Sequence, residues 1–103
     1  MIVIGKINEI YHTDDTPSIF DVISEQSYEG KEDLLKHLSS AKVISAAPGV
    51  ATDVITGEKI DKPLVMKSDG KYAWRSDVEY YISKYNMAID EDVKSDILNF
   101  DSH

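Results

Sequence analysis

The fold is set by residues 64–85, which read LVMKSDGKYAWRSDVEYYISKY. Apolar-rich segments at 64–68 and 71–74 flank Asp69-Gly70, the pair that a two-residue type I′ turn favours. This turn predicts a β-hairpin in which Ser68 pairs with Lys71. Because side chains alternate along a strand, four residues are expected to share one face of the sheet: Val65, Lys67, Tyr72 and Trp74.

A helix is predicted directly after this hairpin. Ser76 and Glu79 have the spacing of a capping box, in which each side chain bonds the backbone N–H of the other residue. Tyr80 lies off the predicted buried side, so we expect its ring to face solvent or a neighbouring protein. The buried side follows i, i+3, i+4, i+7 spacing and comprises Val78, Tyr81, Ile82 and Tyr85.

The rest of the chain alternates between helical and strand periodicity. Further helices are predicted over residues 17–26 and 30–41, and from residue 90, where Asp90 is the expected cap. Strands are predicted within residues 2–11, 43–47 and 50–55, with turns at 48–49 and 56–58 and a linker at 59–63. The pattern predicts one α+β domain over residues 1–103. Its mainly antiparallel sheet should have four to six strands, with about four short helices packed largely on one face.

Composition excludes several classes of protein. The chain has 103 residues, 19 acidic against 11 basic side chains, and no cysteine, which excludes disulfides, zinc–thiolate sites and thiol nucleophiles. No apolar run approaches the roughly 18 residues of a membrane span. The start of the chain lacks the basic lead of a signal peptide, so a cytoplasmic protein is expected.

The net charge of −8 bears on the partner. Such a surface repels nucleic-acid phosphates and favours encounter with a basic protein. Counted by halves, residues 1–50 and 51–103 each carry −4, so neither half is the acidic one. Scattering of acids for solubility alone explains the same count.

Catalytic and metal motifs are weak. His12 with Asp14 and Asp15 is typical of a solvent-facing loop, and His37 is predicted to lie on a helix surface. The acids after residue 89 lack the central glycine of a calcium loop. Neither a phosphate-binding loop nor a Gly-x-Ser-x-Gly elbow is present. We therefore expect no enzyme activity, no cofactor and no metal.

Five aromatic residues fall within fourteen positions: Tyr72, Trp74, Tyr80, Tyr81 and Tyr85. Platforms that stack single-stranded nucleic acid interleave such rings with basic residues, but acidic residues accompany them in this chain. The cluster therefore predicts helix–sheet packing, or a protein interface that uses one or two exposed rings.

Several motifs together resemble a family. They are Pro17-Ser18-Ile19-Phe20-Asp21, Tyr28-Glu29-Gly30-Lys31, Ala47-Pro48-Gly49 with Asp53, Thr56-Gly57-Glu58 and Asp69-Gly70-Lys71-Tyr72-Ala73-Trp74, followed by Asp77, Tyr80-Tyr81 and Lys84-Tyr85. The chain resembles a family of small, uncharacterised bacterial proteins that are similar to immunity proteins of polymorphic-toxin and contact-dependent growth-inhibition systems. The resemblance implies a small cytoplasmic protein that covers a toxin nuclease, and it transfers no catalytic residue.

The resulting hypothesis is an acidic, non-enzymatic inhibitor that binds a basic, nuclease-like toxin domain. The residues expected to contact this partner are Asp53, Glu58, Asp69, Trp74, Asp77, Glu79 and Tyr80. The alternative is a structural or regulatory module that forms a homodimer through the same aromatic surface. A small enzyme is a third class, and it would require a deep pocket with convergent titratable groups.

Overall fold

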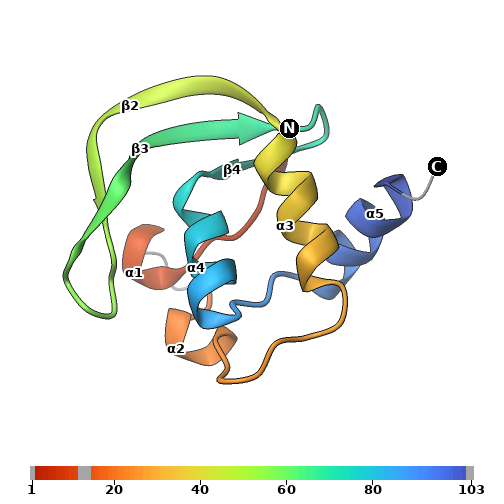
Figure 1. The fold of residues 1–103 in the computed structure, drawn as a ribbon, viewed down its shortest axis with the longest axis horizontal. Helices are drawn as coiled ribbons and strands as arrows, with labels where there is room; N and C mark the ends of the chain where they lie inside the picture. Colours follow the sequence, from red (N-terminus) through yellow and green to blue (C-terminus); the bar gives the residue numbers. More distant parts are fainter. Residues whose placement is uncertain (1, 12–14, 102–103) are drawn as a thin grey trace.

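The structure, a computed structural model, describes residues 2–11 and 15–101 (Figure 1). Within these residues the helices are α1 (Asn8–Tyr11), α2 (Ile19–Val22), α3 (Lys31–Ser40), α4 (Asp77–Tyr85) and α5 (Glu91–Asp101). The strands are β1 (Ile2–Val3), β2 (Lys42–Thr52), β3 (Lys59–Ser68) and β4 (Tyr72–Arg75). The predicted α+β class is confirmed, and His12, Thr13 and Asp14 lie outside the described residues.

The sheet has the strand order β1-β4-β3-β2 and is mixed. β2 pairs with β3 and β3 with β4 in antiparallel directions, whereas β1 runs parallel to β4. The Ile2 N–H donates to the Lys71 carbonyl at 3.2 Å, and the Ile4 N–H donates to the Ala73 carbonyl at 2.8 Å. Two of the three strand pairs described are antiparallel, so the prediction of a mainly antiparallel sheet is confirmed, with one parallel pair at the β1 edge. β1 comes from the start of the chain, so no hairpin dictates its direction.

The β2–β3 hairpin is longer than the sequence predicts. β2 runs through Pro48-Gly49 without a turn, and a register shift between Ala46 and Val50 accommodates the extra residues. β3 includes residues 59–63, which were predicted to be a linker. The chain reverses between β2 and β3 as predicted, with turn residues at 54–56, two residues earlier than expected, and Gly57 has a φ of 77°.

The β3–β4 hairpin is present, but its register differs from the prediction by two residues. Ser68 pairs with Ala73, and Lys67 with Trp74. The Asp69 carboxylate accepts the N–H groups of Lys71 (2.9 Å) and Tyr72 (2.7 Å), so the turn centres one residue later, with Gly70 at φ 99°. A shift of two residues keeps each side chain on its predicted face.

Helix α4 begins where the sequence predicts, but without the capping box. The Ser76 hydroxyl accepts the Val65 N–H at 3.1 Å and donates to the Pro63 carbonyl at 3.3 Å, and it makes no hydrogen bond to the helix. Ser76 therefore joins the helix to β3. The predicted cap of α5 is present, because Asp90 Oδ1 accepts the Asp92 N–H at 2.9 Å.

The N-terminal segment turns into a helix where a strand was predicted. Ile7 is buried and α1 follows it at Asn8. The Glu9 carboxylate accepts hydrogen bonds from the Ser18 hydroxyl (2.6 Å) and the Ile19 N–H (2.7 Å), which lower its pKa. These bonds join α1 to the start of α2.

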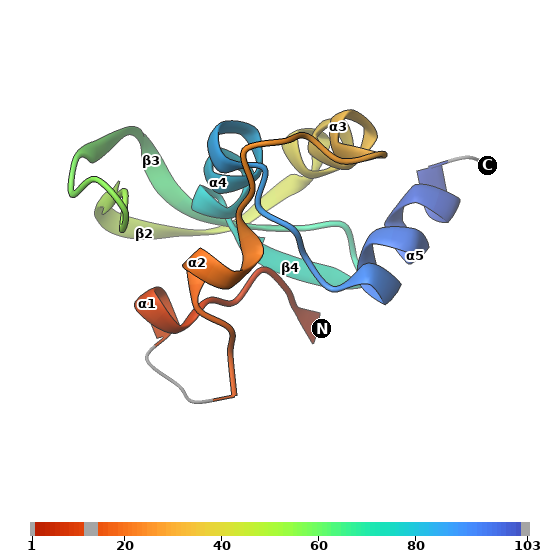
Figure 2. The ribbon, with the colours of Figure 1, turned by 90° about the horizontal axis from the view of Figure 1, so that it is seen from below.

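The core lies between the sheet and the helices α3 and α4, which cover one face of it (Figure 2). Trp74 on β4 is completely buried in this core. The other fully buried apolar side chains are Ile7, Ile19, Leu34, Leu38, Tyr81, Ile82, Met87 and Ile97. Burial of this many large side chains is the main contribution to the stability of the fold.

Candidate functional site

Three of the residues predicted to contact a partner lie inside the protein. Asp53 and Trp74 are 0% exposed and Asp77 is 3% exposed. The expectation that these side chains form part of an open surface is therefore wrong. Their polar atoms bond to other parts of the chain, as follows.

Asp53 is the centre of a cluster that we name the Asp53 anchor. Its Oδ2 accepts the hydroxyls of Tyr80 and Tyr85, each at 2.6 Å. Its Oδ1 accepts the N–H groups of Ile55 (2.8 Å) and Thr56 (3.1 Å). Asp53 lies at the turn between β2 and β3, whereas both tyrosines lie on α4, so the anchor fastens the hairpin to the helix.

The contacts of this cluster shift the pKa values of Asp53 and Tyr85. Burial raises the pKa of Asp53, but the hydrogen bonds from Tyr80, Tyr85 and the backbone outweigh burial and lower the pKa to about 2. The same carboxylate raises the pKa of Tyr85 to about 12. The hydroxyl of Tyr80 also accepts a hydrogen bond from Lys84 Nζ at 3.1 Å. The Tyr80 hydroxyl is therefore bonded within the chain, while the residue itself is half-buried.

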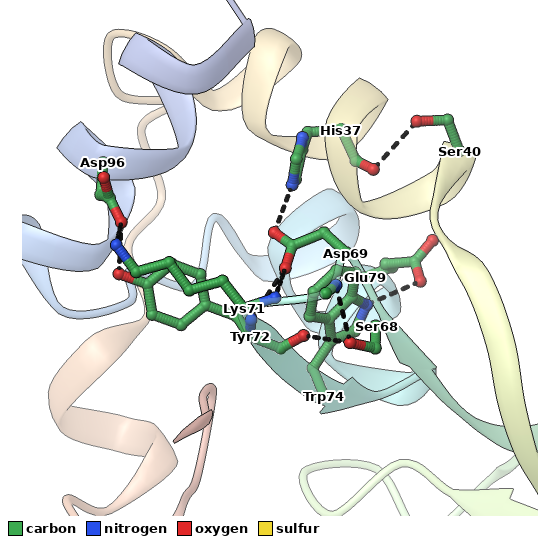
Figure 3. Close-up of polar contacts among 10 residues, drawn as sticks. His37, Ser40, Ser68, Asp69, Lys71, Tyr72, Trp74, Glu79 and Asp96 are labelled. Atoms are coloured by element: carbon green, nitrogen blue, oxygen red, sulfur yellow. Dashed lines mark hydrogen bonds and ion pairs between the residues drawn. The ribbon is translucent and has the colours of Figure 1, made fainter. Parts of the chain in front are cut away.

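A second network surrounds the β3–β4 turn (Figure 3). His37 Nε2 lies 2.8 Å from Asp69 Oδ2, and the imidazole ring lies 6.3 Å from the Trp74 ring. Burial raises the pKa of Asp69, but the hydrogen bonds from the Tyr72 N–H and from His37 outweigh it and lower the pKa. His37 is only 7% exposed, so the prediction of a surface residue is wrong.

The same network reaches α4 and α5 (Figure 3). The Tyr72 hydroxyl donates to Asp96 at 2.6 Å, and Lys71 pairs with the same carboxylate. Glu79 pairs with Lys67 at 3.1 Å and accepts the Trp74 indole N–H at 3.4 Å. Glu79 therefore stabilises the packing of α4 on the sheet.

Asp77 forms a third buried contact. Arg75 Nη2 donates to Asp77 Oδ2 at 3.0 Å, and the Asp77 side chain is 2% exposed. Burial raises the pKa of Asp77, and the charge of Arg75 partly offsets this effect.

A groove of about 910 Å³ brings three of the predicted residues together: Asp77, Glu79 and Tyr80. It lies between the helices α3 and α4 and the β2–β3 hairpin, and its lining mixes both signs of charge. Its basic residues are Lys36, Lys67 and Lys84, and its acidic residues are Glu32, Asp77 and Glu79. Glu58, by contrast, is exposed at the turn between β2 and β3. The predicted contact residues therefore form no continuous anionic surface.

The excess of acidic residues lies elsewhere in the chain. Residues 15–33 and 90–96 together contain ten acidic and two basic residues. Residues 34–89, which include β2, β3, β4 and α4, contain six acidic and eight basic residues. Acidic and basic residues are thus segregated along the chain, and counting by halves hid this because the two acidic segments fall in different halves.

The two acidic segments lie side by side in the structure. The Ala88 N–H donates to the Val22 carbonyl at 2.7 Å, and the Tyr28 hydroxyl donates to the Met87 carbonyl at 2.7 Å. Six exposed carboxylates from these segments constitute what we name the acidic surface: Asp21, Glu25, Glu29, Asp90, Glu91 and Asp92. Reasoning from sequence missed this surface, whose signal was the charge count of the two segments taken together.

The two lysines of these segments are engaged in contacts. Lys94 pairs with Glu91 at 3.2 Å and lies over the Tyr28 ring at 5.2 Å. Lys31 donates to the Asn86 side chain at 2.6 Å. Phe20, which directly precedes Asp21 on α2, is 62% exposed. The acidic surface thus combines an excess of negative charge with an exposed apolar group.

Comparisons with known proteins found no relative of this chain. No family model, no curated protein and no solved structure matches the chain. Among the described residues, no group of three or more His, Asp or Glu side chains is placed to hold a metal ion. The helices described also include none with the length and apolar character needed to cross a membrane.

Proposed function

We propose that this chain is a non-enzymatic, acidic binding protein that neutralises a basic, nuclease-like bacterial toxin domain in the cytoplasm. The observation that carries the proposal is the acidic surface, where carboxylates from two distant segments are exposed side by side. The contact residues proposed are those of this surface, with Phe20 beside them. They replace the set chosen from the sequence.

Electrostatics supports this function. A protein that cleaves nucleic acid must present Lys and Arg to the phosphate backbone. An exposed group of carboxylates is complementary to such a site and would compete with the nucleic acid for it. Attraction between opposite charges also accelerates association. A partly exposed aromatic ring such as Phe20 would add apolar contact that slows dissociation.

The test is a binding titration with a basic, nuclease-like toxin domain. We expect submicromolar affinity that falls at least about tenfold when salt rises from low to physiological concentration. The triple variant Asp21→Asn/Glu25→Gln/Glu29→Gln should weaken binding about tenfold or more. Glu58→Gln, an exposed acid outside the acidic surface, is the matched control and should leave the affinity unchanged. Absence of binding, or affinity independent of both salt and the triple variant, would contradict the proposal.

A homodimer formed through β2 is the second candidate function. β2 lies at the edge of the sheet, and Val43 and Ile44 on it are each 51% exposed. Edge strands pair readily with other chains. A dimer contact through Trp74 is disfavoured, because this side chain is already buried within one chain. Light scattering separates the candidates: a dimer that Ile44→Lys dissociates would favour this alternative.

A further inference from the structure

We propose that an apolar groove beside the acidic surface binds a large apolar side chain of the partner. In the partner's sequence, basic residues flank this side chain. This inference rests on the proposed function and adds the chemistry of the recognised segment. The groove has a volume of about 490 Å³, within the range of ligand-binding clefts. Its apolar lining includes Ile2, Val3, Ile4, Val22, Ile89 and Val93.

The groove lies between three parts of the chain that are distant in sequence. β1 and the residues after it contribute one wall, and the segment between α4 and α5 contributes another. α2 contributes Val22, whose carbonyl accepts the Ala88 N–H at 2.7 Å and so connects the two sides. Ile2 is 56% exposed, so apolar surface remains available to a partner.

Carboxylates outnumber basic groups at this apolar lining. Asp15 and Asp90 line the groove itself, together with the basic residue Lys6. A second groove shares Val22, Ala88 and Ile89 with the first, and Asp21 and Glu91 line it. The apolar groove therefore adjoins the acidic surface directly.

This arrangement selects one kind of occupant. An apolar centre with an acidic rim is complementary to a large apolar side chain with Lys or Arg on either side. Anionic lipids and nucleic acids are disfavoured, because their phosphates would meet the carboxylates of the rim. The groove would thus anchor a basic segment of the toxin domain, while the acidic surface contacts its flanking charges.

The probe is a short lysine-rich peptide with one central tryptophan, and the reference is the same peptide with serine in its place. Calorimetry with the full chain should give about tenfold tighter binding of the tryptophan peptide. Ala88→Phe should remove this preference by filling the mouth of the groove, because Ala88 is exposed and lines it. Ala46→Phe makes the same change on the exposed edge strand β2 and should retain the preference.

A second variant covers the case in which Ala88→Phe fails to fold. Ile2→Thr keeps a β-branched residue in β1 but removes apolar surface, and it should reduce the preference about threefold.

Equal binding of the tryptophan and serine peptides to the wild-type chain, or an unchanged preference in Ala88→Phe, would overturn the inference. If the serine peptide still binds with strong salt dependence, the proposed function survives that result. If neither peptide binds, the electrostatic basis of the proposed function fails as well. Self-association that Ala88→Phe abolishes would instead assign the groove to a second copy of this chain.

Discussion

The Asp53 anchor and the acidic surface use the same chemical group in opposite ways. At the anchor, one carboxylate is completely buried and accepts four hydrogen bonds. On the acidic surface, Asp21, Glu25 and Glu29 are exposed, and their side chains have no hydrogen bond or ion pair to the described residues. The net charge counts both kinds equally. Burial and hydrogen bonding show which carboxylates maintain the fold and which are available to a partner.

Replacing the buried carboxylate should have the largest effect. Asp53→Ala would leave the hydroxyls of Tyr80 and Tyr85 and two backbone N–H groups without their acceptor. We expect the free energy of unfolding to fall by about 3 kcal/mol or more, measured by urea denaturation.

Glu58→Gln is the matched control for this variant, because Glu58 is exposed in the same turn. Its unfolding free energy should stay within about 0.5 kcal/mol of the wild-type value. Equal stability of Asp53→Ala and Glu58→Gln would show that the anchor does not hold the hairpin on α4.

Lowering the pH should have the second-largest effect, because it protonates the Asp53 anchor. The pKa of Asp53 is lowered from 3.8 to about 2 in the folded chain. The resulting stability is fully present above the unfolded value of 3.8 and is lost as the pH falls through about 2. The loss amounts to about 2 kcal/mol. Denaturation at pH 6 and pH 2 should show this loss in the wild type and a smaller one in Asp53→Asn. Identical acid dependence of the two chains would contradict the assignment to Asp53.

The His37–Asp69 contact should matter less. His37→Leu replaces the imidazole with an apolar side chain of similar size near Trp74, and the Asp69 carboxylate retains the N–H groups of Lys71 and Tyr72. We expect a loss of about 1 kcal/mol in unfolding free energy. Trp74 is the single tryptophan of the chain, so its fluorescence should follow the transition. A loss above about 3 kcal/mol would indicate that His37 does more than bond to Asp69.

Local chemistry explains which parts of the fold could be predicted from the sequence. The turn at Gly57, the hairpin near Gly70 and the start of α4 depend on neighbouring residues, and all three are present. The register and the cap were wrong because side chains took other partners. Asp69 bonded the turn, and Ser76 bonded β3. The Asp69 bonds reach only two and three residues along the chain, whereas the Ser76 bond to Val65 spans 11 positions and forms only when the start of α4 meets β3.

The candidate site was predicted less well, for a related reason. The total charge of −8 was available from the sequence, but its location required knowing that the segments around Val22 and Ala88 meet. From the sequence, both Tyr80 and Asp53 were predicted to be residues of an exposed contact surface. The hydrogen bond between them was not predicted. An aspartate at a turn and a tyrosine on a later helix give no local signal of a contact across 27 positions.

Neutralising the acidic surface should have the smallest effect on stability. Asp21→Asn/Glu25→Gln/Glu29→Gln removes three like charges whose side chains form no hydrogen bond or ion pair to the described residues. Because like charges repel, we expect unfolding free energy to stay unchanged or to rise by up to about 0.5 kcal/mol at low salt. Added salt should shrink any gain, since it screens exposed charges.

The same triple variant decides whether the comparison between the two regions is valid. If it loses more than about 1 kcal/mol, these carboxylates maintain the fold as Asp53 does, and their exposure no longer indicates availability to a partner. If stability is retained while the affinity for a basic domain falls, the acidic surface serves binding and the Asp53 anchor serves stability. If the triple variant is more stable than the wild type but binds more weakly, the wild-type chain carries these three charges for recognition and not for folding.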